Sequence, residues 1–192
     1  MNAEPPTGQW FHAADGQRWW FDSGSIAFDF AYTGGFGGPP EWEHWHGPAD
    51  VARWWRERFD VEVSVDDVAY RRARELRSAI ASAVVAAAHD RQIPAGDAAT
   101  IDRYAALPDL PPQLGAPVPP TSDRLLATIG RDAVASLGRP DRIRTCAAGD
   151  CGVMYLDTSR SGSRTWCSMS RCGNRHKVRE LRARRAATRK ER

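Results

Sequence analysis

The four cysteines of this 192-residue chain all lie in its last quarter, and they form two pairs. Cys146 and Cys151 enclose four residues, Cys167 and Cys172 enclose four more, and 15 residues separate the pairs. Two short-range pairs joined by a span long enough for one hairpin are typical of a tetrahedral thiolate site for zinc. Two disulfides or four unrelated buried thiols are the alternatives. Disulfides are disfavoured because no secretory signal is expected at the start of the chain, and unrelated thiols would not fall into two pairs of equal spacing. The spacing therefore predicts one structural zinc ion (Zn2+) held by all four cysteines.

The formal net charge of +3 hides a strong asymmetry along the chain. Residues 1–138 hold 12 Lys and Arg against 19 Asp and Glu, a net charge of −7, whereas residues 139–192 hold 15 against 5, a net charge of +10. Four thiolates on one zinc ion subtract two charges, which leaves about +8 on the second part. A basic module beside an acidic body indicates a polyanionic partner, with nucleic acid first and a merely soluble basic tail as the alternative.

Residues 1–138 are predicted to form a mostly helical domain with one small β-hairpin, so the fold class is mainly α with small hairpins. The hairpin is expected at about 17–31. Its second arm would be Ser25–Phe30, because large apolar residues alternate there with small or polar ones. The helices follow from apolar residues spaced three or four apart, and they are expected at about 48–59, 64–90, 97–107 and 122–137.

Local signals support these elements. Ser64 and Ser122 are predicted to cap the helices that begin near them. Most of the eight tryptophans are expected in the core. A pocket for an unknown small ligand in the N-terminal domain is a candidate as well, lined by Trp19, Trp42, Trp45 and Trp54.

Residues 139–192 are predicted to form a zinc finger. Strands are expected at 153–157 and 164–166, followed by a basic helix over about 170–189 that carries the last ligand. This order is that of a treble clef, with a zinc ribbon as the alternative. Val178 and Leu181 are expected to point inward, and so small a module should depend on zinc to fold.

The basic residues of the finger are mostly arginines, whose planar guanidinium suits phosphate oxygens and guanine edges. We therefore predict a nucleic-acid interface. Its candidate residues are Arg142, Arg144, Arg164, Arg171, Arg175, His176, Lys177, Arg179, Arg182, Arg184 and Arg185.

Several motifs of the finger resemble a known family. Arg142–Cys146, Asp157–Arg160, Trp166–Met169 and Cys172–Lys177 look like the CGNR zinc-finger family, which is named for the tetrapeptide that begins here at Cys172. The resemblance covers about residues 139–185. It implies that the four cysteines are the metal ligands. It also implies that Gly173 and Asn174 direct amide hydrogens at the Cys172 sulfur, and that Asp157 braces Arg160 or another local arginine.

The upstream region resembles the ABATE domain that accompanies this finger in bacterial proteins. Trp20–Gly24, Ile26–Phe30 and Pro48–Val51 carry that resemblance. Tyr32 stands where the family usually has asparagine. The resemblance implies an ABATE-like domain over 1–138 and a CGNR finger over 139–192, in a protein described as a stress-induced transcription regulator or as RNA-binding.

The expected function is that of a DNA-binding transcription regulator in the bacterial cytoplasm, with DNA favoured over RNA as the partner. An RNA-binding protein is the first alternative, and a protein-interaction module that docks on acidic surfaces or on a second copy of the chain is another. An enzyme is not expected, because no nucleophile–base pair, phosphate loop or two-histidine zinc motif is present. Glu43, His44 and His46 are the residues that a second metal would use. No apolar run is long enough to span a membrane.

Overall fold

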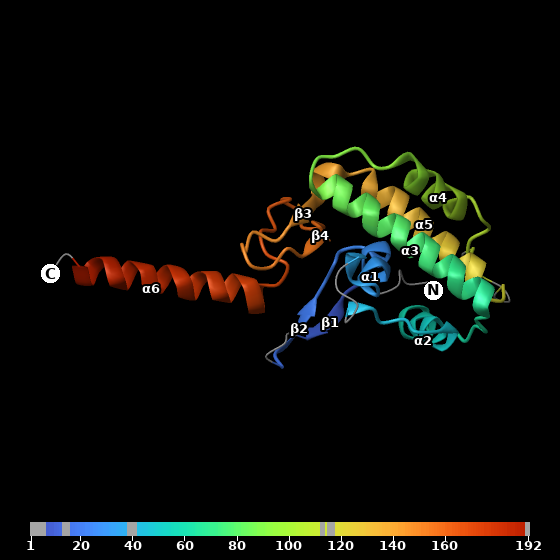
Figure 1. The fold of residues 1–192 in the computed structure, drawn as a ribbon, viewed down its shortest axis with the longest axis horizontal. Coiled ribbons are helices and arrows are strands. Elements are labelled where there is room, and N and C mark those ends of the chain that lie inside the picture. Colours follow the sequence, from blue (N-terminus) through green and yellow to red (C-terminus); the bar gives the residue numbers. More distant parts are fainter. Residues whose placement is uncertain (1–6, 13–15, 38–41, 112–113, 115–117, 191–192) are drawn as a thin grey trace.

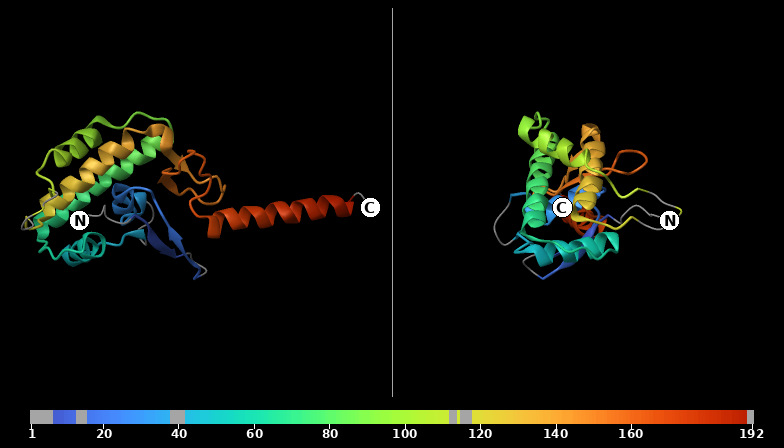
Figure 2. Two further views of the ribbon diagram at one scale, coloured as in Figure 1. Left: turned by 180° about the vertical axis from the view of Figure 1, so that it is seen from behind. Right: turned by 90° about the vertical axis from the view of Figure 1, so that its right-hand side faces the viewer.

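The computed structural model describes residues 7–12, 16–37, 42–111, 114 and 118–190. Figure 1 shows a helical body, a small finger beside it, and a last helix that extends away from both. The helices of the body are α1 (Ile26–Tyr32), α2 (Pro48–Phe59), α3 (Asp67–Ala88), α4 (Ala95–Ala105) and α5 (Ser122–Leu137). α4 packs against α3 and α5, and α1 packs against the same two helices (Figure 2).

The helices lie close to where the apolar spacing places them, but two begin at a different capping residue. α2 occupies the expected residues, with Asp50 accepting the Gly47 amide at 3.2 Å at its first turn. α3 is capped by Asp66, which accepts the Ala69 amide at 2.7 Å, rather than by Ser64. α5 is capped by Thr121 rather than by Ser122. In both cases the actual cap is a residue with extended backbone, two positions after the predicted serine in α3 and one position before it in α5, so both predicted caps were wrong.

The N-terminal hairpin pairs different segments from those predicted. β1 (Gln9–His12) runs antiparallel to β2 (Arg18–Phe21), with Trp10 opposite Trp20. The expected second arm at 25–30 was wrong, because this segment is the helix α1.

Two caps and complete burial explain why α1 is a helix. The Ser25 hydroxyl accepts the Phe28 amide at 3.3 Å, and Asp132 of α5 accepts the Ala27 amide at 2.9 Å. Ile26 to Ala31 are all buried. Since no side of this segment faces water, an alternation of large and small residues cannot distinguish a strand from a buried helix.

Two of the four tryptophans predicted to line a small-ligand pocket, Trp45 and Trp54, lie in the core of the body. Trp45 and Trp54 pack on Phe30, with ring centroids 5.1 and 5.2 Å from it. Trp42 is 55% exposed, and Trp19 belongs to a separate cluster beside the finger. The four tryptophans of the predicted small-ligand pocket therefore do not surround one cavity.

A buried carboxylate ties α1 to the start of the chain that the structure describes. Asp29 is fully buried, accepts the Gly8 amide at 2.6 Å and lies 3.6 Å from Arg58 Nη1. Burial raises the pKa of Asp29 from 3.8 to about 6, although the charge of Arg58 lowers it. The folded state thus holds this proton more tightly than the unfolded chain. The resulting stabilisation is complete below about pH 4 and is lost as the pH rises through about 6.

Replacing Asp29 with asparagine is expected to remove this pH dependence. The rise in pKa corresponds to roughly 3 kcal/mol. Between pH 4 and pH 7, the free energy of unfolding of the wild type should therefore fall by roughly that amount relative to Asp29→Asn. Urea unfolding at several pH values measures it, with Asp102→Asn, an exposed change on α4, expected to follow the wild type. Parallel curves for Asp29→Asn and wild type would contradict the expectation.

Candidate metal centre and nucleic-acid interface

The first cysteine pair lies in the turn of a short hairpin. β3 (Ile143–Thr145) pairs antiparallel with β4 (Met154–Leu156), and Cys146 and Cys151 lie in the connection between them. The predicted pairing of 153–157 with 164–166 was wrong, because 164–166 forms no strand. The main chain of 164–166 begins with a hydrogen bond to a side chain instead of to a strand, because the Asp157 carboxylate accepts the Arg164 amide at 2.9 Å.

The second cysteine pair leads into the last helix. Cys167 precedes a π-helical turn, Met169–Gly173, that contains Cys172, and α6 (Asn174–Lys190) follows directly. The last ligand thus lies at the start of a helix, as a treble clef requires.

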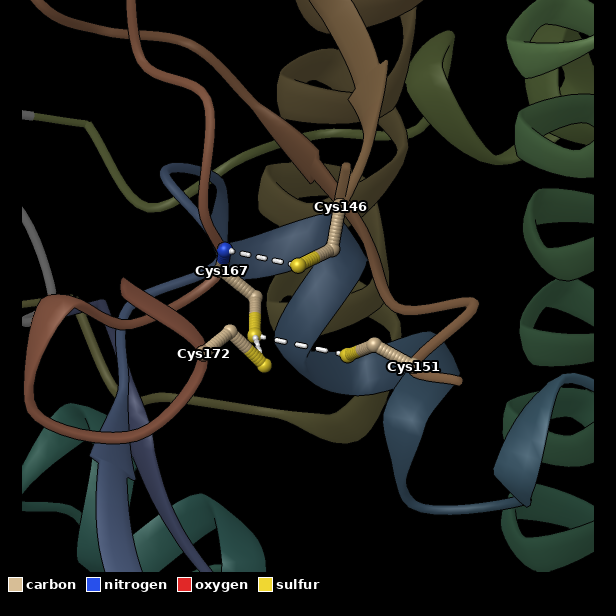
Figure 3. Close-up of side chains that lie close together, drawn as sticks. All are labelled: Cys146, Cys151, Cys167 and Cys172. Carbon is tan, nitrogen blue, oxygen red and sulfur yellow. Dashed lines mark hydrogen bonds between the residues drawn. The ribbon is translucent and has the colours of Figure 1, made fainter. Parts of the chain in front are cut away.

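The four sulfur atoms meet at one point between these elements (Figure 3). All four lie within 4.8 Å of one another, and Cys167 Sγ is 3.6 Å from both Cys151 Sγ and Cys172 Sγ. A tetrahedral zinc ion with Zn–S bonds of about 2.3 Å places its sulfurs about 3.8 Å apart. The cysteines are free thiols rather than disulfides. They fit and hold one structural zinc ion.

The ionisation of the thiols shows why a cation belongs here. A hydrogen bond from the Cys167 thiol lowers the pKa of Cys151 to about 5. The same hydrogen bond, together with burial, raises the pKa of Cys167, and burial raises that of Cys172. Without metal, ionisation is therefore favoured at Cys151 and disfavoured at Cys167 and Cys172. A divalent ion compensates the charge of the others, and their deprotonation accompanies its binding.

The groups that contact the sulfurs differ from those expected. Arg175 Nη2 lies 3.3 Å from Cys172 Sγ, and the Cys167 amide lies 3.4 Å from Cys146 Sγ. The expected amides were wrong: Gly173 donates to the Ser168 carbonyl at 3.1 Å, and the Asn174 amide also donates to main-chain carbonyls. The family tetrapeptide pointed to the arginine, but its role at the metal was missed.

Asp150 ties α6 to the first cysteine pair. Its carboxylate lies 3.3 Å from Arg175 Nη1 and 2.9 Å from Arg179 Nη2. The hydrogen bond from Arg179 is the main reason that the pKa of Asp150 is lowered. Because Asp150 stands between Cys146 and Cys151, these contacts fix the direction in which α6 leaves the metal centre.

The finger is docked into the body through β4. The Leu156 amide donates to the Ser23 carbonyl at 2.8 Å. The Tyr32 hydroxyl donates to the Met154 carbonyl at 2.8 Å and accepts the Met154 amide at 2.9 Å. Gly24 has φ +77°, and a Cβ there would collide with the Leu156 carbonyl oxygen. The close approach of the segment at Gly24 to the strand β4 therefore requires glycine at this position.

The docked finger also shares its hydrophobic cores with the body. Ile143, Met154 and Leu156 are buried in the main core of the body. Tyr155, on the other side of β4, packs with the cysteines and with Phe21 of β2. The body thus supplies apolar contacts that a finger of this length lacks.

Arg164 is partly buried and is held by main-chain carbonyls of the finger and of the body. Its guanidinium donates to the carbonyls of Asp22, Trp166 and Cys167 at 2.8, 3.0 and 2.6 Å. It also lies 4.1 Å from the centroid of the Tyr155 ring. Asp157 supports the same region by accepting main-chain amides instead of bracing a guanidinium. These contacts give Arg164 a structural role, and its contact with nucleic acid stays a prediction.

Replacing Arg164 with lysine should destabilise the finger without removing charge. One ammonium cannot reach three carbonyls, and we expect the free energy of unfolding to fall by about 2–3 kcal/mol. Arg160→Lys, an exposed change in the same loop, is expected to leave it unchanged. Denaturant unfolding of the zinc-loaded protein measures the difference. If both variants unfolded with the same free energy, the three carbonyl contacts of Arg164 would not stabilise the finger.

Some of the other candidate nucleic-acid contacts are held by neighbouring groups of the protein, and others are exposed. Arg142 donates to the Ser159 carbonyl at 3.0 Å, Arg171 lies 3.7 Å from the Trp19 ring centroid, and His176 packs on Trp166. The exposed candidates are Arg144, His176, Lys177, Arg179, Arg182, Arg184 and Arg185, of which His176 and Arg179 also make the contacts already described.

The apolar residues of α6 are not where the sequence predicted them. Val178 is 46% and Leu181 is 49% exposed, so the inward orientation expected for them was wrong. They lack a core because α6 extends away from the body beyond its first turns (Figure 1). Val178, Leu181, Arg182 and Arg185 follow the spacing of one helical face, so that face is both basic and apolar.

The part of the chain that the structure describes lacks a membrane-spanning helix and a second cluster of metal ligands. Within it, no helix is long and apolar enough to cross a membrane. The four cysteines are the one cluster of three or more metal-ligating side chains found among those residues, so Glu43, His44 and His46 form no second metal site there.

Two family models match the chain in succession. Residues 24–140 match the model ABATE, described as "Putative stress-induced transcription regulator". Residues 142–185 match the model described as "CGNR zinc finger". No curated protein matches the chain. The matched families are of regulator and zinc-finger type and not enzyme families.

Proposed function

Because the chain belongs to the ABATE family of transcription regulators and carries a CGNR zinc finger, we propose that it binds DNA through that finger. The observation that supports the proposal is the positive charge of α6 and its extension away from the body. This helix holds eight Lys and Arg against one Glu, a formal charge of +7, and extends from the body (Figure 2). Among those that the structure describes, five of these basic side chains are exposed: Lys177, Arg179, Arg182, Arg184 and Arg185. A polyanion is the partner that such a helix suits.

In this proposal the exposed basic side chains contact phosphates, and those paired with Asp150 orient α6. Lys177, Arg182 and Arg185 make no ion pair with the described part of the chain, and Arg184 makes one with Glu180 at 3.8 Å. Together with Arg144 they would contact phosphates, which supply most of the affinity. Arg175 and Arg179, already held by Asp150, would orient the helix instead.

One face of α6 also suits base edges. Val178 and Leu181 on this face are exposed beside Arg182 and Arg185, and their apolar side chains suit the methyl group of thymine. Sequence preference would come from this face. As a regulator of transcription the protein would act in the cytoplasm of a bacterial cell.

A salt series tests the proposal. The zinc-loaded full chain is titrated into labelled duplex DNA between 50 and 200 mM salt. With about five phosphate contacts, the logarithm of the binding constant should fall with the logarithm of the salt concentration with a slope of about −4.5. Absence of binding at low salt, or binding that is indifferent to salt, would contradict it. An RNA duplex of the same sequence distinguishes the two nucleic acids.

The exposure of Val178 and Leu181 favours a second candidate, a protein-interaction module. The basic finger of one copy would then dock on the acidic body of another, where residues 1–138 carry a net charge of −7. Gel filtration of the wild type and of Arg182→Glu/Arg185→Glu separates the candidates. A dimer that becomes a monomer in the variant supports docking between copies, and a monomer in both supports nucleic acid.

A further inference from the structure

A groove of about 600 Å³ opens where the N-terminal hairpin meets the finger. β2 contributes Trp20 to its lining, and the segment 163–170, which carries the first cysteine of the second pair, contributes most of the rest. Trp20 is 46% and Met169 is 53% exposed, so an indole and a thioether both face solvent here. Ser163, Ser168 and Ser170 add hydroxyl groups.

The position of Trp20 is held by the structure around it. Its ring lies so close to the Gly8 main chain that a Cβ at Gly8 would lie 2.6 Å from the indole. Gly8 is itself fixed through its amide to Asp29 at 2.6 Å. Across the hairpin, Trp20 packs edge-on against Trp10, with the ring centroids 5.5 Å apart. An exposed ring that is fixed before binding loses little entropy when a ligand stacks on it.

The groove suits a nucleobase. Every base has a flat π-face that stacks on an aromatic side chain, and its edge needs hydrogen-bond donors and acceptors of the kind that serine hydroxyls supply. Large apolar side chains that gather at a hollow of a protein surface mark an interaction site. A base within a duplex cannot enter such a groove, because its faces are already stacked. The occupant must therefore be unpaired.

The charge around the groove favours the same occupant. Arg18 lies 4.0 Å from the Trp10 ring centroid, and Arg171 lies 3.7 Å from that of Trp19, so guanidinium groups accompany the hairpin on both faces. The segment 163–170 runs directly into the turn that starts α6. The groove itself is lined by Arg164 and by the carboxylate of Asp22. A strand whose phosphates lie along α6 can thus continue past Arg171 to the groove. In Figures 1 and 2 the hairpin and the start of α6 lie on the same side of the body.

We propose that this groove takes one unpaired base of the nucleic acid that α6 holds, with the base stacked on Trp20. The proposal rests on the proposed function and makes it more specific: the preferred ligand is DNA that is locally open, not a perfect duplex.

The experiment compares two labelled probes of one sequence, a full duplex and the same duplex with a short central bubble. The zinc-loaded wild type should bind the bubble about tenfold more tightly, the size of effect that one base–aromatic stack gives. Trp20→Ala should remove that preference and keep the affinity for the full duplex. Trp20→Phe should retain it. Trp42→Ala, which removes another exposed indole in the body, should behave as the wild type.

The outcomes distinguish failure of the base site from failure of the proposed DNA binding. Equal, salt-sensitive binding of both probes by the wild type would overturn the base site and leave DNA binding intact. A preference that survives in Trp20→Ala would do the same. Absence of binding to either probe would overturn both. One zinc ion per chain in Trp20→Ala and in Trp20→Phe shows that the finger has folded in each variant.

Discussion

Cys172→Ser is expected to lose the zinc ion and to unfold the finger. Structural zinc contributes about 10–16 kcal/mol to the folding of isolated fingers near neutral pH, which is comparable to the net stability of a whole domain. Around the cysteines the finger has little to replace it, because Val178 and Leu181 are exposed and Tyr155 packs on the cysteines themselves; Ile143, Met154 and Leu156 pack in the core of the body instead. Metal analysis should give one zinc per chain for the wild type and close to none for the variant.

The matched control is Cys151→His. Cys151 is the only one of the four ligands that is partly exposed, and a histidine nitrogen completes a three-cysteine, one-histidine zinc site. This variant should keep one zinc ion and a cooperative thermal transition close to that of the wild type. If Cys172→Ser also kept its zinc and its transition, the metal would not be what holds the finger together.

Arg182→Glu/Arg185→Glu is expected to weaken DNA binding by about 100-fold at low salt. Both side chains are exposed on α6, so their reversal removes two phosphate contacts and introduces repulsion. The magnitude of the salt slope should fall by about two, since each contact contributes about 0.9. Neither residue contacts the metal centre, so the zinc content and the unfolding transition should remain unchanged.

An equal change of charge elsewhere is the control. Arg71→Glu/Arg91→Glu lowers the formal charge from +3 to −1, as the α6 variant does, but at exposed positions of the body. It should leave the affinity within about threefold of the wild type, because charges farther away than a Debye length of about 10 Å are screened. If both double variants lost affinity equally, net charge rather than α6 would govern binding.

The metal centre could be predicted from the sequence because its chemistry is local. Cysteine pairs with four intervening residues bring their sulfurs together whatever surrounds them, and the helices follow from equally local spacing. Predictions failed where distant residues decide the outcome. The segment 25–30 is a helix because Asp132, more than 100 residues away, caps it and because the body buries it on all sides.

The finger shows the same limit. Its hairpin was paired wrongly because β4 is held by Ser23 and Tyr32 of the body, which no local pattern reveals. Composition marks arginines as basic but cannot separate their roles. Arg164 and Arg175 are occupied by carbonyls, a sulfur and Asp150, whereas Arg182 and Arg185 are exposed. That division depends on which carbonyls and carboxylates the fold brings within reach.

The central claim is that one zinc ion fixes the finger into the body and thereby sets the direction of α6. Hydrogen–deuterium exchange of the full chain, with zinc and after its removal by a chelator, tests this most directly. We predict that removal of zinc abolishes protection across 143–173 and also lowers it across 18–32, where Phe21, Ser23 and Tyr32 contact the finger. Unchanged protection across 18–32, alongside complete exchange in the finger, would contradict the claim.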